Sequence, residues 1–160
     1  MSRRDRIFDI NLEGFEELQR QFQKAERDFR PSVKKHMTRF ALNVQGDAQK
    51  LVPVDSGELQ SSIHTVPARE TSEGIVTSVG TNNEYALRRH EEPYKPGVRP
   101  KYERGAKFDM YYVNGRGYGT RNQPGVGQYK AGRKYMQNAV LHNESNFGKM
   151  CENILREVLK

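Results

Sequence analysis

Several kinds of residue are scarce in this chain of 160 residues. It has no tryptophan and one cysteine, Cys151. A single cysteine cannot form a disulfide within the chain, which excludes a disulfide scaffold and favours synthesis in the cytosol. No apolar run approaches the ~18 residues of a membrane span. The start of the chain, Met1 to Arg6, is charged and has no apolar stretch behind it, so we expect no secretory signal.

Hydrophobic residues are also few. They make up 34% of the sequence, and the mean hydropathy is -0.93. Both values are low for a self-sufficient globular domain. The length suits one domain with a modest core, so we predict a single domain over residues 1–160. Part of the chain then either stays outside the core or packs only against a partner.

The charge, by contrast, is concentrated in one segment. The net charge is +7, and residues 93–130 hold eight basic residues and two acids, a net of +6. The same segment has 7 of the 14 glycines, 4 of the 7 prolines and 6 of the 8 tyrosines. This composition does not make a conventional core. It predicts a long basic arm, inserted in the domain over residues 93–130.

The arm is the candidate interface. Tyrosine and arginine dominate protein interfaces, and tyrosine interleaved with cations also suits nucleic acid. We favour docking on protein over contact with nucleic acid, and simple solvation comes third. The candidate contact residues are Tyr94, Arg99, Lys101, Tyr102, Arg104, Lys107, Tyr111, Tyr112, Arg116, Tyr118, Arg121, Tyr129 and Lys130.

A β-hairpin is expected inside the arm. Residues Lys107 to Val113 have strand character, and Asn114-Gly115 is a strong signal for a two-residue turn. Residues Gly117 to Thr120 would then form a weak return strand.

Two helices are predicted before residue 53. Phe15, Leu18, Phe22, Ala25 and Phe29 form one apolar stripe at helical spacing. We expect Arg30-Pro31 to end that helix, because proline suits the first turn of a new one. A second stripe runs to Leu51 through Val33, Met37, Phe40, Ala41, Val44 and Ala48. We expect both stripes to supply much of the core.

The remaining patterns predict a small sheet and further helices. Pro53 to Leu59 is a turn, and Ser61 to Val66 and Gly74 to Gly80 are two antiparallel strands. Short helical segments are expected over 84–92, 134–140 and 146–159. The predicted fold class is α+β, with helices packed on a small antiparallel β-sheet and a long basic Gly/Tyr-rich arm or β-hairpin insertion.

The sequence contains no convincing catalytic or metal-binding pattern. His36, His64, His90 and His142 are scattered, and His90-Glu91 lacks the second histidine of a metalloprotease helix. Cys151 falls on an apolar stripe and is expected to be buried. Residues 127–134 lack the Gly-Lys-Ser/Thr of a phosphate-binding loop. We therefore expect no enzyme activity, no cofactor and no metal.

Four motifs, in order, carry a resemblance. Residues Leu12 to Leu18 fit Leu-x-Gly-x-x-x-Leu, and Pro53 to Ile63 resemble Pro-Val-Asp-Thr-Gly-x-Leu-x-x-Ser-Ile. Residues Tyr85 to Glu91 are similar to Tyr-Ala-x-x-x-His/Glu-Glu. Residues Lys134 to Val140 are similar to Phe-Leu-x-x-Ala. The order and spacing resemble the small neck proteins of tailed bacteriophages. These are called tail-completion, head–tail joining, tail-terminator or minor capsid proteins.

This resemblance implies an α+β subunit without catalysis that forms a ring at the head–tail junction, around the DNA channel. A hexamer is favoured and a dodecamer is possible. The partners would be a portal-side connector ring and tail-tube or tail-terminator proteins, with possible non-specific contact to channel DNA. The location would be the virion neck, with assembly in the host cytoplasm. The motif residues carried over are Pro53, Asp55, Gly57, Leu59, Tyr85, His90 and Glu91. The rival reading is a stand-alone nucleic-acid-binding protein that uses the same arm.

Overall fold

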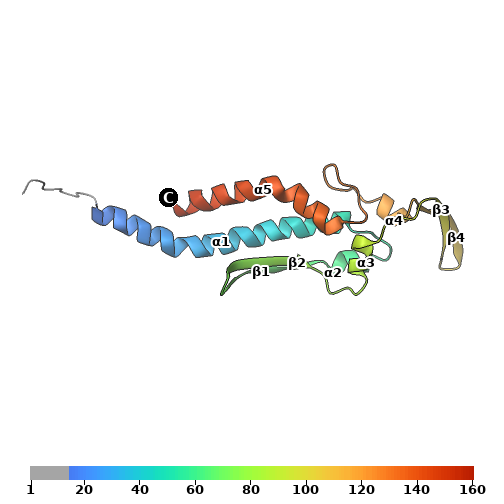
Figure 1. The fold of residues 1–160 in the computed structure, drawn as a ribbon, viewed down its shortest axis with the longest axis horizontal. Helices are drawn as coiled ribbons and strands as arrows, with labels where there is room; N and C mark the ends of the chain where they lie inside the picture. The colour runs from blue at the N-terminus through green and yellow to red at the C-terminus, as the bar shows by residue number, and fades with distance from the viewer. Residues whose placement is uncertain (1–14) are drawn as a thin grey trace, which may run out of the picture.

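The computed structural model describes residues 15–160 and shows an elongated molecule built along one long helix (Figure 1). Helix α1 (Phe15–Leu51) lies beside helix α5 (Tyr135–Val158) and packs against the antiparallel hairpin of β1 (His64–Thr71) and β2 (Gly74–Gly80). A second antiparallel hairpin, β3 (Val98–Glu103) and β4 (Ala106–Val113), projects at the far end. The short helices α2 (Glu58–Ser62), α3 (Ala86–Glu91) and α4 (Tyr118–Arg121) lie between these parts. The predicted α+β class is confirmed. The start of the first motif, Leu12 to Gly14, lies outside the described residues.

The predicted break at Arg30-Pro31 is wrong, because α1 continues through Pro31. Proline removes one helical hydrogen bond and costs about 3 kcal/mol in a helix interior. Helix α5 supplies a physical reason for the continuity. Its buried residues contact Ala25, before the proline, and Val33, after it, so the same partner holds both halves of α1. The ribbon of α1 bends in its N-terminal, blue part (Figure 1), as expected for a helix that contains proline.

The core lies in two clusters along α1. The larger one joins the C-terminal half of α1 to α2, α3 and α5 through residues such as Ala48, Leu51 and Ile63. The smaller one places Met150, Ile154 and Val158 of α5 against the middle of α1. Phe40 packs against both clusters, and its ring meets Phe147 edge-on at 5.9 Å.

Apart from Ala25, the described side chains of the first apolar stripe do not supply core as predicted. Helix α1 extends past the C-terminal end of α5 (Figure 1). Leu18, Phe22 and Phe29 are exposed, and the fraction reaches 67% for Phe22. Helical periodicity shows that a face is apolar, but α5 ends before it reaches this part of the face.

The predicted pairing of two strands is confirmed. Strand β2 has the expected bounds, and the register runs from His64 opposite Gly80 to Thr71 opposite Gly74. Strand β1 begins at His64 instead of Ser61, because residues Glu58–Ser62 form α2. The amide of Ala68 donates to Thr38 Oγ1 at 2.9 Å, which fixes the hairpin to α1.

The two C-terminal segments predicted separately form one helix, α5. The polar stretch between them is explained by Asn143, which is buried. Its Nδ2 donates to Asp47 Oδ2 at 2.7 Å and to the carbonyl of Ala139 at 3.0 Å. The expected burial of Cys151 is wrong, because this residue of α5 is exposed.

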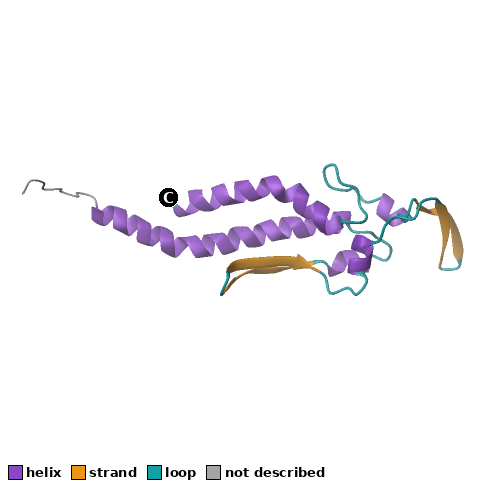
Figure 2. Cartoon of the chain, in the orientation of Figure 1, coloured by secondary structure: helices purple, strands orange, loops and turns teal. Residues whose placement is uncertain are grey.

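A hairpin forms in the arm, but its predicted partner strand is wrong. Strand β4 pairs with β3, which precedes it, through a turn at Arg104-Gly105. The Asn114-Gly115 turn also forms, with φ of 49° and 78°, but it closes a single bridge between Val113 and Arg116. Residues Gly117 to Thr120 do not form a strand, because the chain turns into α4 (Figure 2).

The second part of the arm packs on the body. Val126 is buried in the larger core cluster, and Tyr129 packs against it. The hydroxyl of Thr120 pairs with the backbone of Val54, accepting from its N–H at 2.9 Å and donating to its carbonyl at 3.2 Å. Residues 117–130 therefore contribute to the core, which the composition of the arm did not indicate.

The two phenylalanines of α1 give a test of these faces. We expect Phe40→Asp to destabilise the fold by about 3 kcal/mol or more, because a charge replaces a ring that contacts both core clusters. Phe22→Asp serves as the matched control and should change stability by no more than about 0.5 kcal/mol. Thermal and urea unfolding measure both. Equal losses would show that the free end of α1 is covered in the folded subunit.

Candidate docking site

The turn that follows α1 places one carboxylate at the base of the projecting hairpin. Pro53 and Val54 end the helix, and Gly57 has a φ of 86°, a left-handed conformation that favours glycine. The chain then enters α2, whose Leu59 is buried in the core. This reversal leaves Asp55 exposed, where side chains of the arm reach it.

Asp55 is the point at which the arm joins this turn. Lys101 of β3 donates to both carboxylate oxygens, at 2.5 and 2.6 Å, and Tyr111 of β4 donates its hydroxyl to Oδ1 at 2.9 Å. The Lys101 ammonium also lies 4.9 Å from the centre of the Tyr111 ring. Each strand of the hairpin therefore contributes one side chain to the same acid.

The ionisation of these groups reflects the contact. The hydrogen bond from Lys101 lowers the pKa of Asp55 below its usual 3.8, against an opposing effect of burial, and Tyr111 and Arg89 lower it further. Burial disfavours the charge on Lys101, yet Asp55 raises its pKa. Burial, followed by the negative charge of Asp55, raises the pKa of Tyr111. All three groups therefore keep the protonation states that the contact needs near neutral pH.

A distortion in the hairpin aims Tyr111 at Asp55. Arg99 pairs with Tyr112 and Lys101 with Phe108, so Pro100 faces three residues on β4. Proline has no N–H to complete the ladder there. Met110 takes up the excess length with a φ of 57°, a left-handed conformation that is strained for this residue. Arg121 donates to its carbonyl at 3.0 Å.

The third motif, Tyr85 to Glu91, anchors the other side of the site. The amide of Lys134 donates to the carbonyl of His90 at 2.9 Å, and the Lys134 ammonium pairs with Glu91. The His90 ring meets the Tyr135 ring edge-on at 5.0 Å. These contacts fix α3 to the start of α5. The predicted motif residues His90 and Glu91 therefore hold α3 in position beside the site.

Tyr94 holds the beginning of the arm. Its hydroxyl accepts a hydrogen bond from the amide of Arg133 at 2.7 Å. The hydroxyl lies against Gly132, where any β-carbon would collide with it. Gly132 is therefore required for this contact, which no local sequence pattern indicates.

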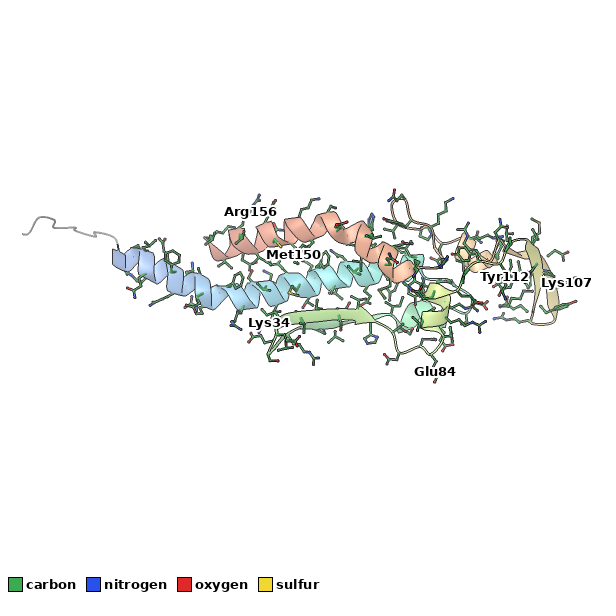
Figure 3. All side chains as sticks on the ribbon, viewed as in Figure 1. Lys34, Glu84, Lys107, Tyr112, Met150 and Arg156 are labelled. Carbon is green, nitrogen blue, oxygen red and sulfur yellow. The ribbon has the colours of Figure 1, made fainter. Side chains whose placement is uncertain are left out.

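A cleft of about 660 Å³ lies between these pieces. The turn at residues 53–59, helix α3 and the inner part of the hairpin form its walls. Tyr112 is labelled on the body side of the hairpin and Lys107 on its outer side (Figure 3). Residues of the turn motif and of the basic arm, which were predicted separately from the sequence, thus line the same cleft.

The other predicted contact residues are divided between three places. Arg99, Arg116 and the ring of Tyr112 line the cleft. Tyr102, Arg104 and Lys107 are exposed on the outer part of the hairpin. The rest lie on the return path: Tyr118, whose ring lies beneath Arg121, Tyr129, which packs on the core, and Lys130, which is exposed. Sequence reasoning missed Arg89, Thr120 and Gly132, because each matters through a contact distant in sequence.

The described residues offer neither a metal site nor a membrane-spanning helix. Within residues 15–160, no group of three or more His, Cys, Asp or Glu side chains could hold a metal ion. In that range, no helix is both long enough and apolar enough to cross a membrane.

Comparison with known proteins assigns part of the chain. Residues 16–87 match the family model described as "Bacteriophage HK97-gp10, putative tail-component". The match confirms the predicted resemblance to the neck and tail-completion proteins of tailed bacteriophages. Residues 16–87 therefore resemble a phage tail component. The matched region includes α1, the turn with Asp55 and the β1–β2 hairpin, and it ends before the arm. No significant match was found among curated proteins or among solved structures.

The turn itself can be tested at Gly57. We expect Gly57→Val to destabilise the protein by more than about 1 kcal/mol, because valine is disfavoured at a φ of 86°. Space is not the cause, since a β-carbon there would meet nothing within 4 Å. Gly57→Asn should cost less, because asparagine tolerates the left-handed region. Unfolding that is equally affected by both variants would contradict this explanation.

Removing the carboxylate should release the hairpin without unfolding the body. Asp55 is 52% exposed at its side chain, so Asp55→Ala should cost about 1 kcal/mol or less. Amide hydrogen exchange at Tyr111 to Val113 should nevertheless become faster, because the strand loses its attachment. Glu58→Ala removes a neighbouring acid of the same turn and should leave this exchange unchanged.

The same attachment has a defined pH dependence. Because the pKa of Asp55 is lower in the folded protein, its contribution is present above about pH 3.8 and declines as the pH falls through the folded value. Exchange at Tyr111 to Val113 that is identical in wild type and Asp55→Ala at neutral pH would refute the role of Asp55.

Proposed function

We propose that this protein is a non-enzymatic subunit of a ring at the phage head–tail junction, and that its β3–β4 hairpin docks on an adjacent virion protein. The observation that carries the proposal is the exposure of this hairpin. A two-stranded hairpin is at best marginally stable in water by itself. This one projects from the end of the body and rests on it through Asp55 at its base (Figure 1).

The composition of the hairpin suits a protein partner. Val98, Tyr102 and Met110 are 57%, 71% and 61% exposed. They lie among Arg104 and Lys107, which form no ion pair within the described residues. Exposed apolar and aromatic side chains surrounded by cations are typical of interfaces that become buried on assembly.

A second exposed surface supports contact between copies. Leu18, Phe22 and Phe29 on α1, together with Phe147 and Leu155 on α5, are exposed apolar side chains on the two long helices. A chain with low hydrophobic content that still exposes such residues is expected to complete its core by assembly. Ring formation, with a hexamer favoured, follows from the family resemblance and agrees with this surface.

Nucleic acid remains the rival ligand of the hairpin, since cations and tyrosines can also bind phosphates and bases. The two readings differ in oligomeric state. Size-exclusion chromatography with light scattering should show a ring or concentration-dependent assembly. A monomer with tight DNA affinity would support the rival.

The structure defines a clean deletion for the functional test. The amide of Asn114 donates to the carbonyl of Gly97 at 2.9 Å, and Gly97 N–H donates to Asn114 Oδ1 at 3.1 Å. The two ends of the hairpin thus lie together, so a two-residue Gly-Ser linker can replace residues 98–113. We expect a cooperative melt to survive, because Val126 and Thr120 stay in place, and head–tail joining to fail in a complementation assay.

Charge reversal identifies the partner. Arg104→Glu should reduce joining, while Arg69→Glu, an exposed reversal on the β1–β2 hairpin, serves as the control. If the partner is protein, a reversal on that protein should restore joining. If it is DNA, no protein change will restore it, and binding will weaken steeply with salt. Normal joining by the protein without residues 98–113 would contradict the proposal.

A further inference from the structure

The cleft at the base of the hairpin has an excess of unpaired positive charge. Of its three acids, Asp55 is bound by Lys101 and Tyr111, and Glu92 pairs with Arg88. Glu58 is the remaining one. Four cations of the lining have no ion-pair partner within the described residues. These are Arg89, Lys95, Arg99 and Arg116. A site with this balance favours an anionic ligand.

Most tyrosine side chains of the cleft already make contacts within the protein. Lys101 and the rings of Phe108 and Tyr112 pack around Tyr111, at centre-to-centre distances of 6.2 and 4.9 Å for the two rings. Tyr94 is held through its hydroxyl by Arg133 and lies against Gly132. Single-stranded nucleic acid binds by stacking its bases on free aromatic faces. Three of the four tyrosines of the lining are committed to such contacts, and Tyr85 lies exposed at the rim.

The free groups instead suit carboxylates. A guanidinium presents a planar fork of donors that matches a carboxylate with two parallel hydrogen bonds. Arg89 comes from α3, Arg99 from β3 and Arg116 from the turn after β4, so the forks face the cleft from separate walls. A volume of about 660 Å³ lies within the ~300–1,000 Å³ range of small ligand sites and suits a short peptide segment.

We propose that this cleft binds an acidic peptide segment of another virion protein. The inference rests on the docking function proposed for the hairpin, and it names the chemistry of the partner. The segment comes from a different protein, because this chain has no acidic run longer than two residues, as at Glu16-Glu17 and Glu91-Glu92. Binding would join the turn, α3 and the hairpin base across one ligand, and so fix the direction in which the hairpin projects.

The test uses the full-length purified subunit and a fluorescein-labelled hexaglutamate peptide, followed by fluorescence anisotropy at low salt. Hexaglutamate should bind, and hexaglutamine of the same length should not. Arg99→Ala and Arg116→Ala should each weaken binding about tenfold or more, because each removes a charged hydrogen bond. Arg104→Ala and Lys107→Ala remove the same charge outside the cleft and should have less than about a twofold effect.

Three outcomes would overturn the inference. Hexaglutamate that fails to bind, or equal losses in the cleft and outer variants, would show that no specific site exists. An unlabelled oligothymidylate that displaces the peptide, and depends on the same arginines, would identify a nucleic-acid site instead. Circular dichroism of each variant checks folding, and Arg99→Lys, which keeps the charge but not the fork, should bind with intermediate affinity.

These results separate the two proposals. Peptide binding is measured on the purified subunit and does not depend on joining. If head–tail joining fails without residues 98–113 but hexaglutamate does not bind, the docking function of the hairpin is supported and the proposed acidic ligand is refuted. If hexaglutamate binds but heads and tails join normally without the hairpin, the cleft is a binding site for acidic peptides and the hairpin is not needed for joining.

Discussion

The contact of Asp55 with Lys101 and Tyr111 determines how the projecting hairpin is placed. The turn that carries Asp55 follows a long helix packed on both sides, so the carboxylate has a fixed position. Each strand of the hairpin sends one donor to it. A two-stranded ribbon without such an attachment would have no defined direction. This ion pair is half exposed and contributes little to stability, so its value lies in orientation.

The surrounding irregularities follow from this requirement. Pro100 interrupts the ladder, and the strained Met110 turns β4 so that Tyr111 faces inward. Strain of this kind persists where neighbouring contacts hold it, here the Asp55 hydrogen bond and the bond from Arg121. The cleft lies where the distorted strand meets the turn, and Arg89, Arg99 and Arg116 remain unpaired along it. The same feature that orients the hairpin therefore creates a site for an anionic partner.

Sequence periodicity predicted the parts of the fold that depend on local pattern. The exact bounds of β2 and the turn after α1 followed from such patterns. Periodicity failed where the structure depends on contacts between residues distant in sequence. The continuity of α1 through Pro31 depends on α5, and the burial of Asn143 depends on Asp47. The exposure of Phe22 depends on where α5 ends. The sequence predicted the motif residues around Asp55 and the contact residues of the arm, but not that they form one site. No local pattern shows that Asp55 contacts Lys101.

The central claim is that the hairpin touches another virion protein in the finished particle. A photo-crosslinking amino acid at Tyr102, which is 71% exposed on the hairpin, tests it directly when particles are irradiated and the products identified by mass spectrometry. We expect crosslinks to a virion protein other than this one. Crosslinks to DNA alone, or particles in which Tyr102 forms no crosslink while a control position at Phe22 does, would contradict it.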